Sequence, residues 1–309
     1  MNLSVQLAPR NPRGLLLRNP VMAASGTFGY GEEFAEIVDI QRLGAIVCKG
    51  TTLKPRPGNP QPRIVETACG MLNSIGLENV GVDKLIAEKA PVWAGWRAPV
   101  IVNIAGSALA EYRELAARLD GVPGIAGIEM NISCPNVRSG GMEFGMKPEL
   151  TARVTAAVRE KTALPLIVKL SPNAGDVVGI ARAASSEGAD ALCLINTLKG
   201  MAIDLRGKRR LPGFGTGGLS GPAIKPVALY MVYSVSQAVD VPVIGCGGIE
   251  TARDALEFLA AGASAIQVGT ANFTNPAATM DVLDGLEAYL LENRILDVKA
   301  LIGIAHSWG

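Results

Sequence analysis

Short apolar runs rich in valine and isoleucine recur along the chain, and most of them stop at glycine, proline, asparagine or serine. Runs of this length with such boundaries are typical of buried β-strands. The sequence therefore predicts eight strands, at residues 20–26, 45–50, 99–106, 127–134, 165–172, 191–197, 242–249 and 265–270.

Most segments between these strands have the periodicity of amphipathic helices, with apolar positions at i, i+3, i+4 and i+7. The clearest examples are residues 108–119, 148–161, 177–188, 251–262 and 277–292. Strands that are apolar on both faces and alternate with helices are typical of a covered parallel sheet. We predict an α/β fold, a (β/α)8 TIM barrel formed by one domain over residues 1–309, with a doubly wound sheet as the alternative.

Two connections, 51–98 after the second strand and 198–241 after the sixth, are too long for simple crossovers. Connections of this length are usually functional loops, so we predict two long insertions here. Before the first barrel strand, the apolar segments 3–7 and 14–21 flank PRNPRG. This arrangement predicts an N-terminal β-hairpin that closes the bottom of the barrel.

Charge and composition exclude several classes of protein. The chain has 29 basic and 28 acidic residues and a formal net charge of +1, which argues against nucleic-acid and membrane-surface partners. No apolar run reaches the ~18 residues of a membrane span, and we expect a cytoplasmic protein. The single histidine is His306, which argues against Ser-His-Asp catalysis and multi-histidine metal sites. Five cysteines without a CxxC pair predict no disulfide framework and no metal site.

Polar residues end five of the predicted strands, at the face where barrel enzymes place their active sites. They are Lys49, Asn103, Asn131 with Cys134, Lys169, and Asn196 with Thr197. The two lysines are flanked by apolar residues, and a lysine is rarely buried without a negative partner. We therefore expect an anionic group inside the barrel.

The last two strands end in glycines instead. Gly247, Gly248, Gly269 and Thr270 follow strands seven and eight, where barrels frequently bind phosphate through backbone N–H groups. They predict a phosphate cradle.

Cys134 lies in NISCPN at the end of the fourth strand. Because no histidine is available in the body of the chain, a thiol with a reference pKa of ~8.5 is a candidate general base. Cys48, Cys193 and Cys246 are interpreted as buried, inert thiols.

The motifs ASGTFGYG, VCKGTT, RPGNPQPR, LNSIGL, NISCPN, VKLSP, INTLKGMAID, GGLSGPAIKP and GCGGI resemble those of the flavin-containing dihydroorotate dehydrogenases over nearly the whole chain. Class 1 members of that family use cysteine as the base, so Cys134 indicates class 1. The segments TFGYG and INTLKGMAID resemble the NAD-dependent class 1B more than the fumarate-using class 1A.

The resemblance implies one FMN per chain and no metal. The implied flavin-binding residues are Ser25, Lys49, Gly50, Asn103, Asn131, Lys169, Ile195, Gly221, Gly247, Gly248, Gly269 and Thr270. The implied substrate-binding residues are Lys49, Asn73, Ser74, Ile75, Gly76, Leu77, Asn131, Asn196 and Thr197.

The resemblance also implies a reaction in pyrimidine (UMP) biosynthesis. The thiolate of Cys134 would remove a proton from C5 of (S)-dihydroorotate while C6 gives a hydride to flavin N5. Electrons would then pass to a partner subunit that carries FAD and a 2Fe–2S cluster and reduces NAD. The implied assembly is a heterotetramer of two catalytic and two electron-transfer chains around a homodimer core.

Other functions remain open from the sequence. They are a class 1A fumarate-dependent enzyme, a flavoprotein like dihydropyrimidine dehydrogenase, and a barrel aldolase with Lys169 as Schiff-base nucleophile. A non-enzymatic flavin-binding scaffold within a larger complex is a further alternative.

Overall fold

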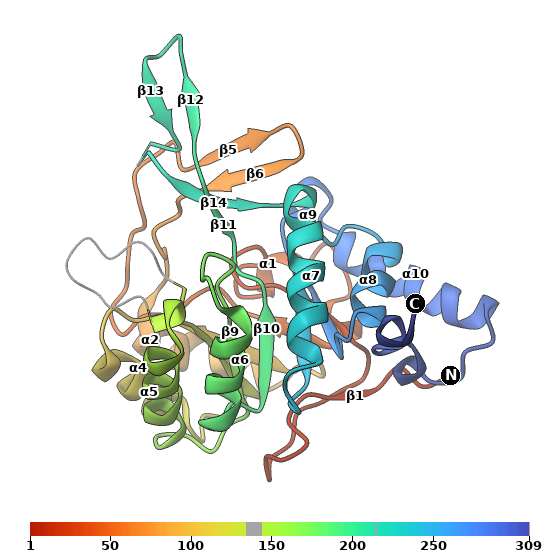
Figure 1. Ribbon diagram of the computed structural model, residues 1–309. Helices are drawn as coiled ribbons and strands as arrows, with labels where there is room; N and C mark the ends of the chain where they lie inside the picture. The colour runs from red at the N-terminus through yellow and green to blue at the C-terminus, as the bar shows by residue number, and fades with distance from the viewer. Residues whose placement is uncertain (134–143, 214, 309) are drawn as a thin grey trace.

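The computed structural model describes residues 1–133, 144–213 and 215–308. Eight parallel strands close into a barrel in the order β10-β15-β16-β3-β4-β7-β8-β9 (Figure 1). They are β3 (Val21–Ala23), β4 (Ala45–Val47), β7 (Val100–Ile104), β8 (Gly127–Asn131), β9 (Leu166–Lys169), β10 (Ala191–Leu194), β15 (Val243–Cys246) and β16 (Ala265–Val268). Each lies within one of the eight predicted strands, so the barrel prediction is confirmed and the doubly wound sheet is wrong.

Helices cover the outside of the barrel, which explains why its strands are apolar on both faces. The longer ones are α4 (Leu109–Leu119), α5 (Pro148–Arg159), α6 (Val177–Ser186), α7 (Lys225–Ser236), α8 (Ala252–Ala260) and α10 (Ala278–Glu292). Short helices are α1 (Glu32–Ala35), α2 (Gly81–Lys84), α3 (Ala90–Trp93), α9 (Ala271–Thr274), the π-helix η2 (Leu85–Lys89), and the 3-10 helices η1 (Ile40–Arg42), η3 (Phe144–Met146), η4 (Pro222–Ile224), η5 (Val298–Leu301) and η6 (Ile304–Ser307). Among the described residues, none of these helices has the length and apolar character to cross a membrane.

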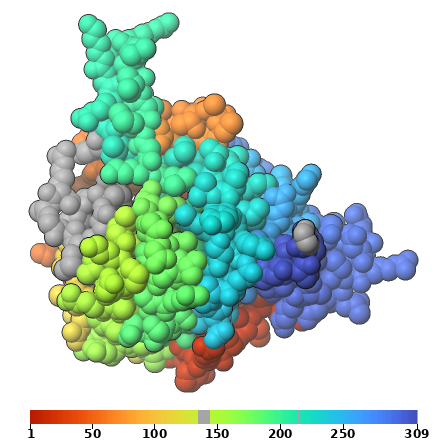
Figure 2. Space-filling view, in the orientation of Figure 1, coloured from red at the N-terminus to blue at the C-terminus, as the bar shows by residue number. Residues whose placement is uncertain are grey.

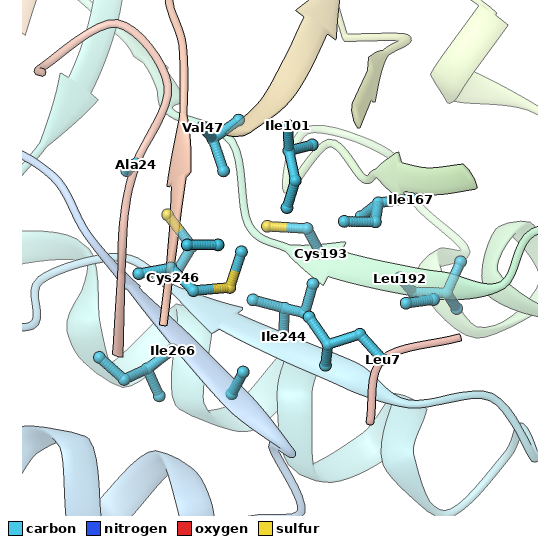
Figure 3. Close-up of a cluster of buried hydrophobic side chains, with 14 of the residues drawn as sticks. Leu7, Ala24, Val47, Ile101, Ile167, Leu192, Cys193, Ile244, Cys246 and Ile266 are labelled. Carbon is cyan, nitrogen blue, oxygen red and sulfur yellow. The ribbon is translucent and has the colours of Figure 1, made fainter. Parts of the chain in front are cut away.

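The predicted N-terminal hairpin is present and closes the amino end of the barrel. β1 (Val5–Gln6) pairs antiparallel with β2 (Leu16–Leu17), and the Leu7 amide donates to the carbonyl of Leu15 at 2.9 Å. The Leu7 side chain is fully buried and lies beside Ile244 in the barrel interior (Figure 3). The hairpin therefore seals one end of the core.

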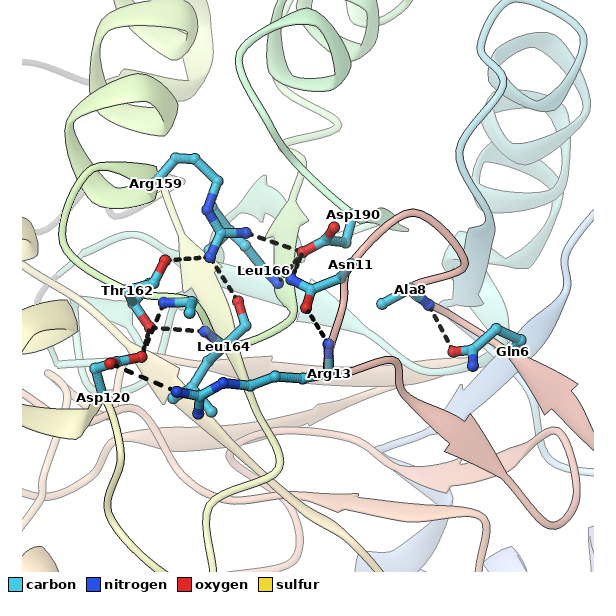
Figure 4. A network of polar contacts seen from close by, with 11 residues as sticks. Gln6, Ala8, Asn11, Arg13, Asp120, Arg159, Thr162, Leu164, Leu166 and Asp190 are labelled. Carbon is cyan, nitrogen blue, oxygen red and sulfur yellow. Dashed lines mark hydrogen bonds and ion pairs between the residues drawn. The ribbon is translucent and has the colours of Figure 1, made fainter.

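Polar contacts connect the loop of this hairpin to the starts of β9 and β10 (Figure 4). Asn11 Nδ2 donates to Asp190 Oδ2 at 3.0 Å, and the same oxygen accepts from the Leu166 amide at 2.8 Å. Arg159 forms an ion pair with Asp190 at 3.0 Å. The charge of the Asp190 carboxylate is thus balanced by Arg159, and its hydrogen bonds join the hairpin loop to the start of β9.

The two long insertions form a sheet of their own at the carboxyl end of the barrel. β5 (Ile64–Thr67) and β6 (Gly70–Asn73) come from the first insertion, and β11 (Leu198–Gly200) and β14 (Gly217–Ser220) come from the second. The four strands are ordered β11-β14-β6-β5, so β6 pairs with β14 across the two insertions. A second hairpin, β12 (Ala202–Asp204) and β13 (Arg209–Leu211), stands out from the surface (Figures 1 and 2).

Candidate active site

A cavity of about 730 Å³ opens at the carboxyl ends of the barrel strands and extends to the insertion sheet. The strand ends and residues from both insertions line this cavity. All twelve residues predicted to bind the flavin are among the lining residues, and so are all but one of the residues predicted to bind substrate. Its volume is typical of a cofactor or ligand site. The structure thus brings together residues that are far apart in the sequence.

Ser74 is the predicted residue that does not line the cavity. It is buried, and both its carbonyl oxygen and its hydroxyl accept hydrogen bonds from Asn59 Nδ2, at 2.9 and 3.1 Å. Its side chain therefore holds the loop after β6 in place. Cys134, the predicted base, lies outside the described residues, but its neighbour Ser133 lines the cavity.

The floor of the cavity is a ring of four buried polar side chains from four barrel strands. Glu129 accepts from Asn103 Nδ2 at 2.7 Å through Oε1 and from Gln267 Nε2 at 2.6 Å through Oε2. Lys169 Nζ donates to Gln267 Oε1 at 3.0 Å and lies 3.7 Å from Glu129 Oε1. Glu129 is the anionic group that the buried lysine requires, so that expectation is confirmed.

Lys169 is held as a cation at this floor. Burial alone lowers the pKa of a lysine, but the neighbouring Cys246 and Glu129 outweigh it and raise the pKa of Lys169 above its usual value. A Schiff-base lysine needs a lowered pKa. The environment of Lys169 therefore disfavours the aldolase alternative.

The buried thiols in the barrel differ from one another. Burial raises the pKa of Cys48 to about 12 and also raises that of Cys193, so both thiols stay protonated. Cys246 borders the cavity, and its sulfur lies in the barrel interior with that of Cys193 (Figure 3). A hydrogen bond from Cys193 and the charge of Lys169 lower the pKa of Cys246 to about 7 despite its burial.

Asn103, which lines the cavity, carries an unpaired acceptor. Its Nδ2 donates to Glu129, which leaves Oδ1 buried and without a hydrogen-bond partner among the described residues. A Cβ built on Gly50, another cavity residue, would lie 3.2 Å from this oxygen. Buried acceptors are rarely left unpaired, so this atom indicates a ligand that donates a hydrogen bond here.

Amide side chains cluster beside this floor. Asn131 Oδ1 accepts from Asn196 Nδ2 at 3.2 Å and from the Ser133 amide at 3.2 Å. Asn196 Oδ1 accepts from the Thr197 amide at 2.8 Å, and Asn73 Nδ2 donates to the Gly218 carbonyl at 3.3 Å. The predicted substrate amides therefore converge from the end of β8, the segment after β10 and the insertion sheet. Such groups both donate and accept, as recognition of a ring with N–H and C=O groups requires.

Lys49 is a second cation in the cavity wall. Its Nζ lies 4.0 Å from Glu78 Oε1 and 5.8 Å from the centre of the Tyr30 ring. Burial raises the pKa of Tyr30 to about 12, so this ring is neutral. Arg63 also forms an ion pair with Glu78, and Lys49 therefore shares its anionic partner.

Two glycines of the predicted cradle, and Gly221 beside them, have backbones that favour glycine. Gly221, Gly247 and Gly248 have φ values of +89°, +131° and +72°. A Cβ on Gly248 would lie 2.9 Å from the Gly221 carbonyl oxygen and 2.7 Å from Lys225 Cβ. These positions therefore have both the conformation and the crowding that exclude side chains. Gly269 and Thr270 border the same part of the cavity.

Sequence reasoning missed Glu129 and Gln267, which complete the floor without lining the cavity. A signal for Glu129 was available, because residues two apart in a strand share a face and Asn131 was already assigned to the site. Gln267 is a polar residue within an otherwise apolar strand. Its position in the sequence does not indicate which residues it contacts.

Comparison with known proteins shows the family of this chain. The family model described as dihydroorotate dehydrogenase matches residues 10–290. The chain belongs to the dihydroorotate dehydrogenase family. The resemblance inferred from the motifs is therefore confirmed, and the chain is an oxidoreductase of this family.

Two similar relatives are named as the catalytic subunit of dihydroorotate dehydrogenase B (NAD(+)). The protein of Geotalea uraniireducens is 59% identical over 302 residues, which cover 98% of this chain and 97% of the relative. That of Pelobacter propionicus is 60% identical over 293 residues, covering 95% and 96%. A crystal structure of the Eimeria tenella enzyme in complex with ferulenol matches with a TM-score of 0.80 and 25% identity, covering 99% of this chain and 89% of that one.

Proposed function

We propose that this chain is the catalytic subunit of an NAD-linked dihydroorotate dehydrogenase, which oxidises (S)-dihydroorotate to orotate in pyrimidine biosynthesis. The observation that carries the proposal is the cavity floor, where the charged Lys169 borders a space of ligand size together with Asn103, whose side-chain oxygen is unpaired. Membership of the family supports the same reaction.

FMN is the cofactor that these residues fit. The crowded glycines Gly221, Gly247 and Gly248 would hold its phosphate, together with Gly269 and Thr270. The ring would be lined by Ser25, Lys49, Gly50, Asn103, Asn131, Lys169 and Ile195. When bound, FMN supplies the hydride acceptor.

Two of these residues have chemistry suited to a flavin. The Lys169 cation favours the negative charge that a flavin gains on reduction, because a fixed charge needs no reorganisation during the reaction. The unpaired Asn103 oxygen would accept a hydrogen bond from a ring N–H. The buried floor thus offers both a charge and an acceptor.

The remaining polar groups would hold the substrate. Asn131, Asn196, Thr197 and Asn73 would contact the alternating N–H and C=O groups of the pyrimidine ring, and the Lys49 ammonium would attract its carboxylate. The loop residues Ile75, Gly76 and Leu77 also line the cavity, while Ser74 supports them through Asn59.

Cys134 is the proposed general base, and its thiolate would remove the proton from C5 of dihydroorotate. It follows Ser133, which borders the cavity, in the chain. A base beside the half-buried amides would act where bound cofactor and substrate exclude water, which strengthens its interaction with the substrate.

The electrons would leave through a partner electron-transfer subunit that carries FAD and a 2Fe–2S cluster and reduces NAD. The words "catalytic subunit" in the relatives' names support such a partner. We propose a heterotetramer of two catalytic and two electron-transfer chains, with a homodimer of catalytic chains at its centre.

Anaerobic titration of the purified protein tests the proposal. The isolated chain should be yellow, and dihydroorotate should bleach its flavin absorbance stoichiometrically. Dihydrouracil, which lacks the carboxylate, is the matched control and should leave the colour unchanged. A colourless protein, or a yellow protein that only dihydrouracil bleaches, would overturn the assignment, and the second result would favour a dihydropyrimidine-dehydrogenase-like activity.

A further inference from the structure

Glu129 is a buried carboxylate that the reaction above does not use. It is fully buried in the middle of β8, two residues before Asn131, and it does not line the cavity. A buried charge is expensive unless it is paired and hydrogen-bonded. Its contacts therefore indicate what it does.

Both carboxylate oxygens of Glu129 are used, and their partners lead to the cavity. Asn103, which donates to Oε1, is also the register partner of Glu129 on β7. Gln267 donates to Oε2 and accepts from Lys169 through its own amide oxygen. Glu129 therefore contacts the cavity residue Asn103 directly. It is linked to the cavity residue Lys169 through Gln267, and its Oε1 also lies 3.7 Å from Lys169 Nζ.

The first consequence concerns orientation. An ionised carboxylate only accepts hydrogen bonds, so Asn103 must turn its NH₂ group toward Glu129. Its carbonyl oxygen is then turned away from Glu129 and lies beside Gly50, another cavity residue. The same reasoning orients Gln267, whose NH₂ group faces Glu129 and whose oxygen faces Lys169.

The second consequence concerns charge. Lys169 places a positive charge at the floor, and Glu129 places a negative charge beside it on the side away from the cavity. In a buried setting the two charges are weakly screened. At a flavin above the floor, the negative charge of Glu129 would therefore reduce the positive electrostatic potential of Lys169.

We propose that Glu129 is a positioning residue that fixes the hydrogen-bonding face of Asn103 toward the flavin and moderates the charge of Lys169, and so sets the flavin's reduction potential. This inference rests on the proposed function, because it requires a flavin at the floor. It assigns no contact between Glu129 and the cofactor.

The test is the FMN midpoint potential of Glu129→Gln, measured on the purified chain beside its FMN dissociation constant. Removing the negative charge leaves Lys169 unopposed, so reduced FMN should gain about tenfold in affinity relative to oxidised FMN. For a two-electron couple this ratio is an upward shift of about 30 mV. Oxidised FMN should bind about tenfold more weakly, because the new NH₂ group opposes the amides of Asn103 and Gln267.

Two further variants separate charge from structure. Glu129→Asp keeps the charge on a shorter side chain, so its potential should stay near the wild-type value while FMN affinity falls about tenfold. Glu111→Gln removes a carboxylate that binds Ser107 and does not line the cavity, and it should change neither quantity. If Glu129→Gln does not fold, Glu129→Asp decides: wild-type FMN affinity in that variant would overturn the proposal.

The outcomes distinguish this inference from the function on which it rests. A colourless wild-type protein would overturn both. A yellow wild-type protein bleached by dihydroorotate, with an unchanged or lower potential in Glu129→Gln, would overturn the role of Glu129 alone. An upward shift in Glu129→Gln that is absent from Glu129→Asp and Glu111→Gln would support it.

Discussion

Gly248 combines a left-handed backbone, with φ of +72°, and close contact with the Gly221 carbonyl and Lys225. Gly248→Ala should therefore distort the cradle, and the variant should purify with less FMN and bind it at least about tenfold more weakly. Gly121→Ala is the matched control, because Gly121 has φ of +75° but nothing within 4 Å of a new Cβ. Backbone strain should lower the stability of both variants by about 1 kcal/mol, and Gly248→Ala should lose more because its new Cβ also meets Gly221 and Lys225. Equal FMN retention in the two variants would argue against the cradle.

Cys134→Ala tests the proposed base. Loss of a general base typically reduces turnover by about 10²- to 10⁴-fold, and FMN should still bind because the cradle and floor are unchanged. Stopped-flow bleaching by dihydroorotate measures the loss directly. Cys48→Ala is the control, since burial raises the pKa of that thiol to about 12 and keeps it protonated. Bleaching of Cys134→Ala at the wild-type rate would show that another group takes the proton.

The residues of the site were predictable to different degrees. Polar residues at strand ends stand out against apolar runs, so Asn103 and Lys169 were found from pattern alone. The need for an anion near Lys169 was also predictable, and the position of Glu129, two residues before Asn131 in the same strand, was a signal for its identity. Glu129 lies inside a strand, where a single charge does not reveal which neighbouring strands supply its partners.

At the scale of elements, the barrel strands were predictable and the insertion sheet was not. Barrel strands such as β7 are buried along their whole length, and burial on both faces produces an unbroken apolar run. In β6 and β14, by contrast, most residues are half-buried, and both strands begin with glycine. Their pairing joins Asn73 to Gly218, which are separated by more than a hundred residues, so no local pattern records it.

The N-terminal hairpin should contribute to stability through its buried leucine. Leu7 is completely buried against the barrel interior, and Leu7→Ala should lower the free energy of unfolding by about 2–5 kcal/mol. Leu16, on the same hairpin, is 66% exposed, and Leu16→Ala should change the free energy of unfolding by no more than about 0.5 kcal/mol. Urea denaturation of both variants measures the difference. Equal, small losses would show that the hairpin does not seal the core.

At the scale of the whole molecule, the barrel and the insertion sheet enclose one shared chamber. Its volume of about 730 Å³ lies within the usual range for a single ligand site, and FMN with one small ring would occupy it. NAD would enter only by displacing the substrate. Oxidation of dihydroorotate and reduction of NAD should therefore take place on different subunits.

This division predicts how the isolated chain behaves after it is reduced. With excess dihydroorotate under anaerobic conditions, the flavin should bleach and stay bleached when NAD is added, because the bound pyrimidine would occupy the space that NAD needs. Adding the electron-transfer subunit should restore the colour and start continuous NADH production. Fumarate is the control oxidant: rapid recolouring by fumarate would indicate class 1A chemistry. Rapid NADH formation by the chain alone would contradict the division, since it would require both reactions in one chamber.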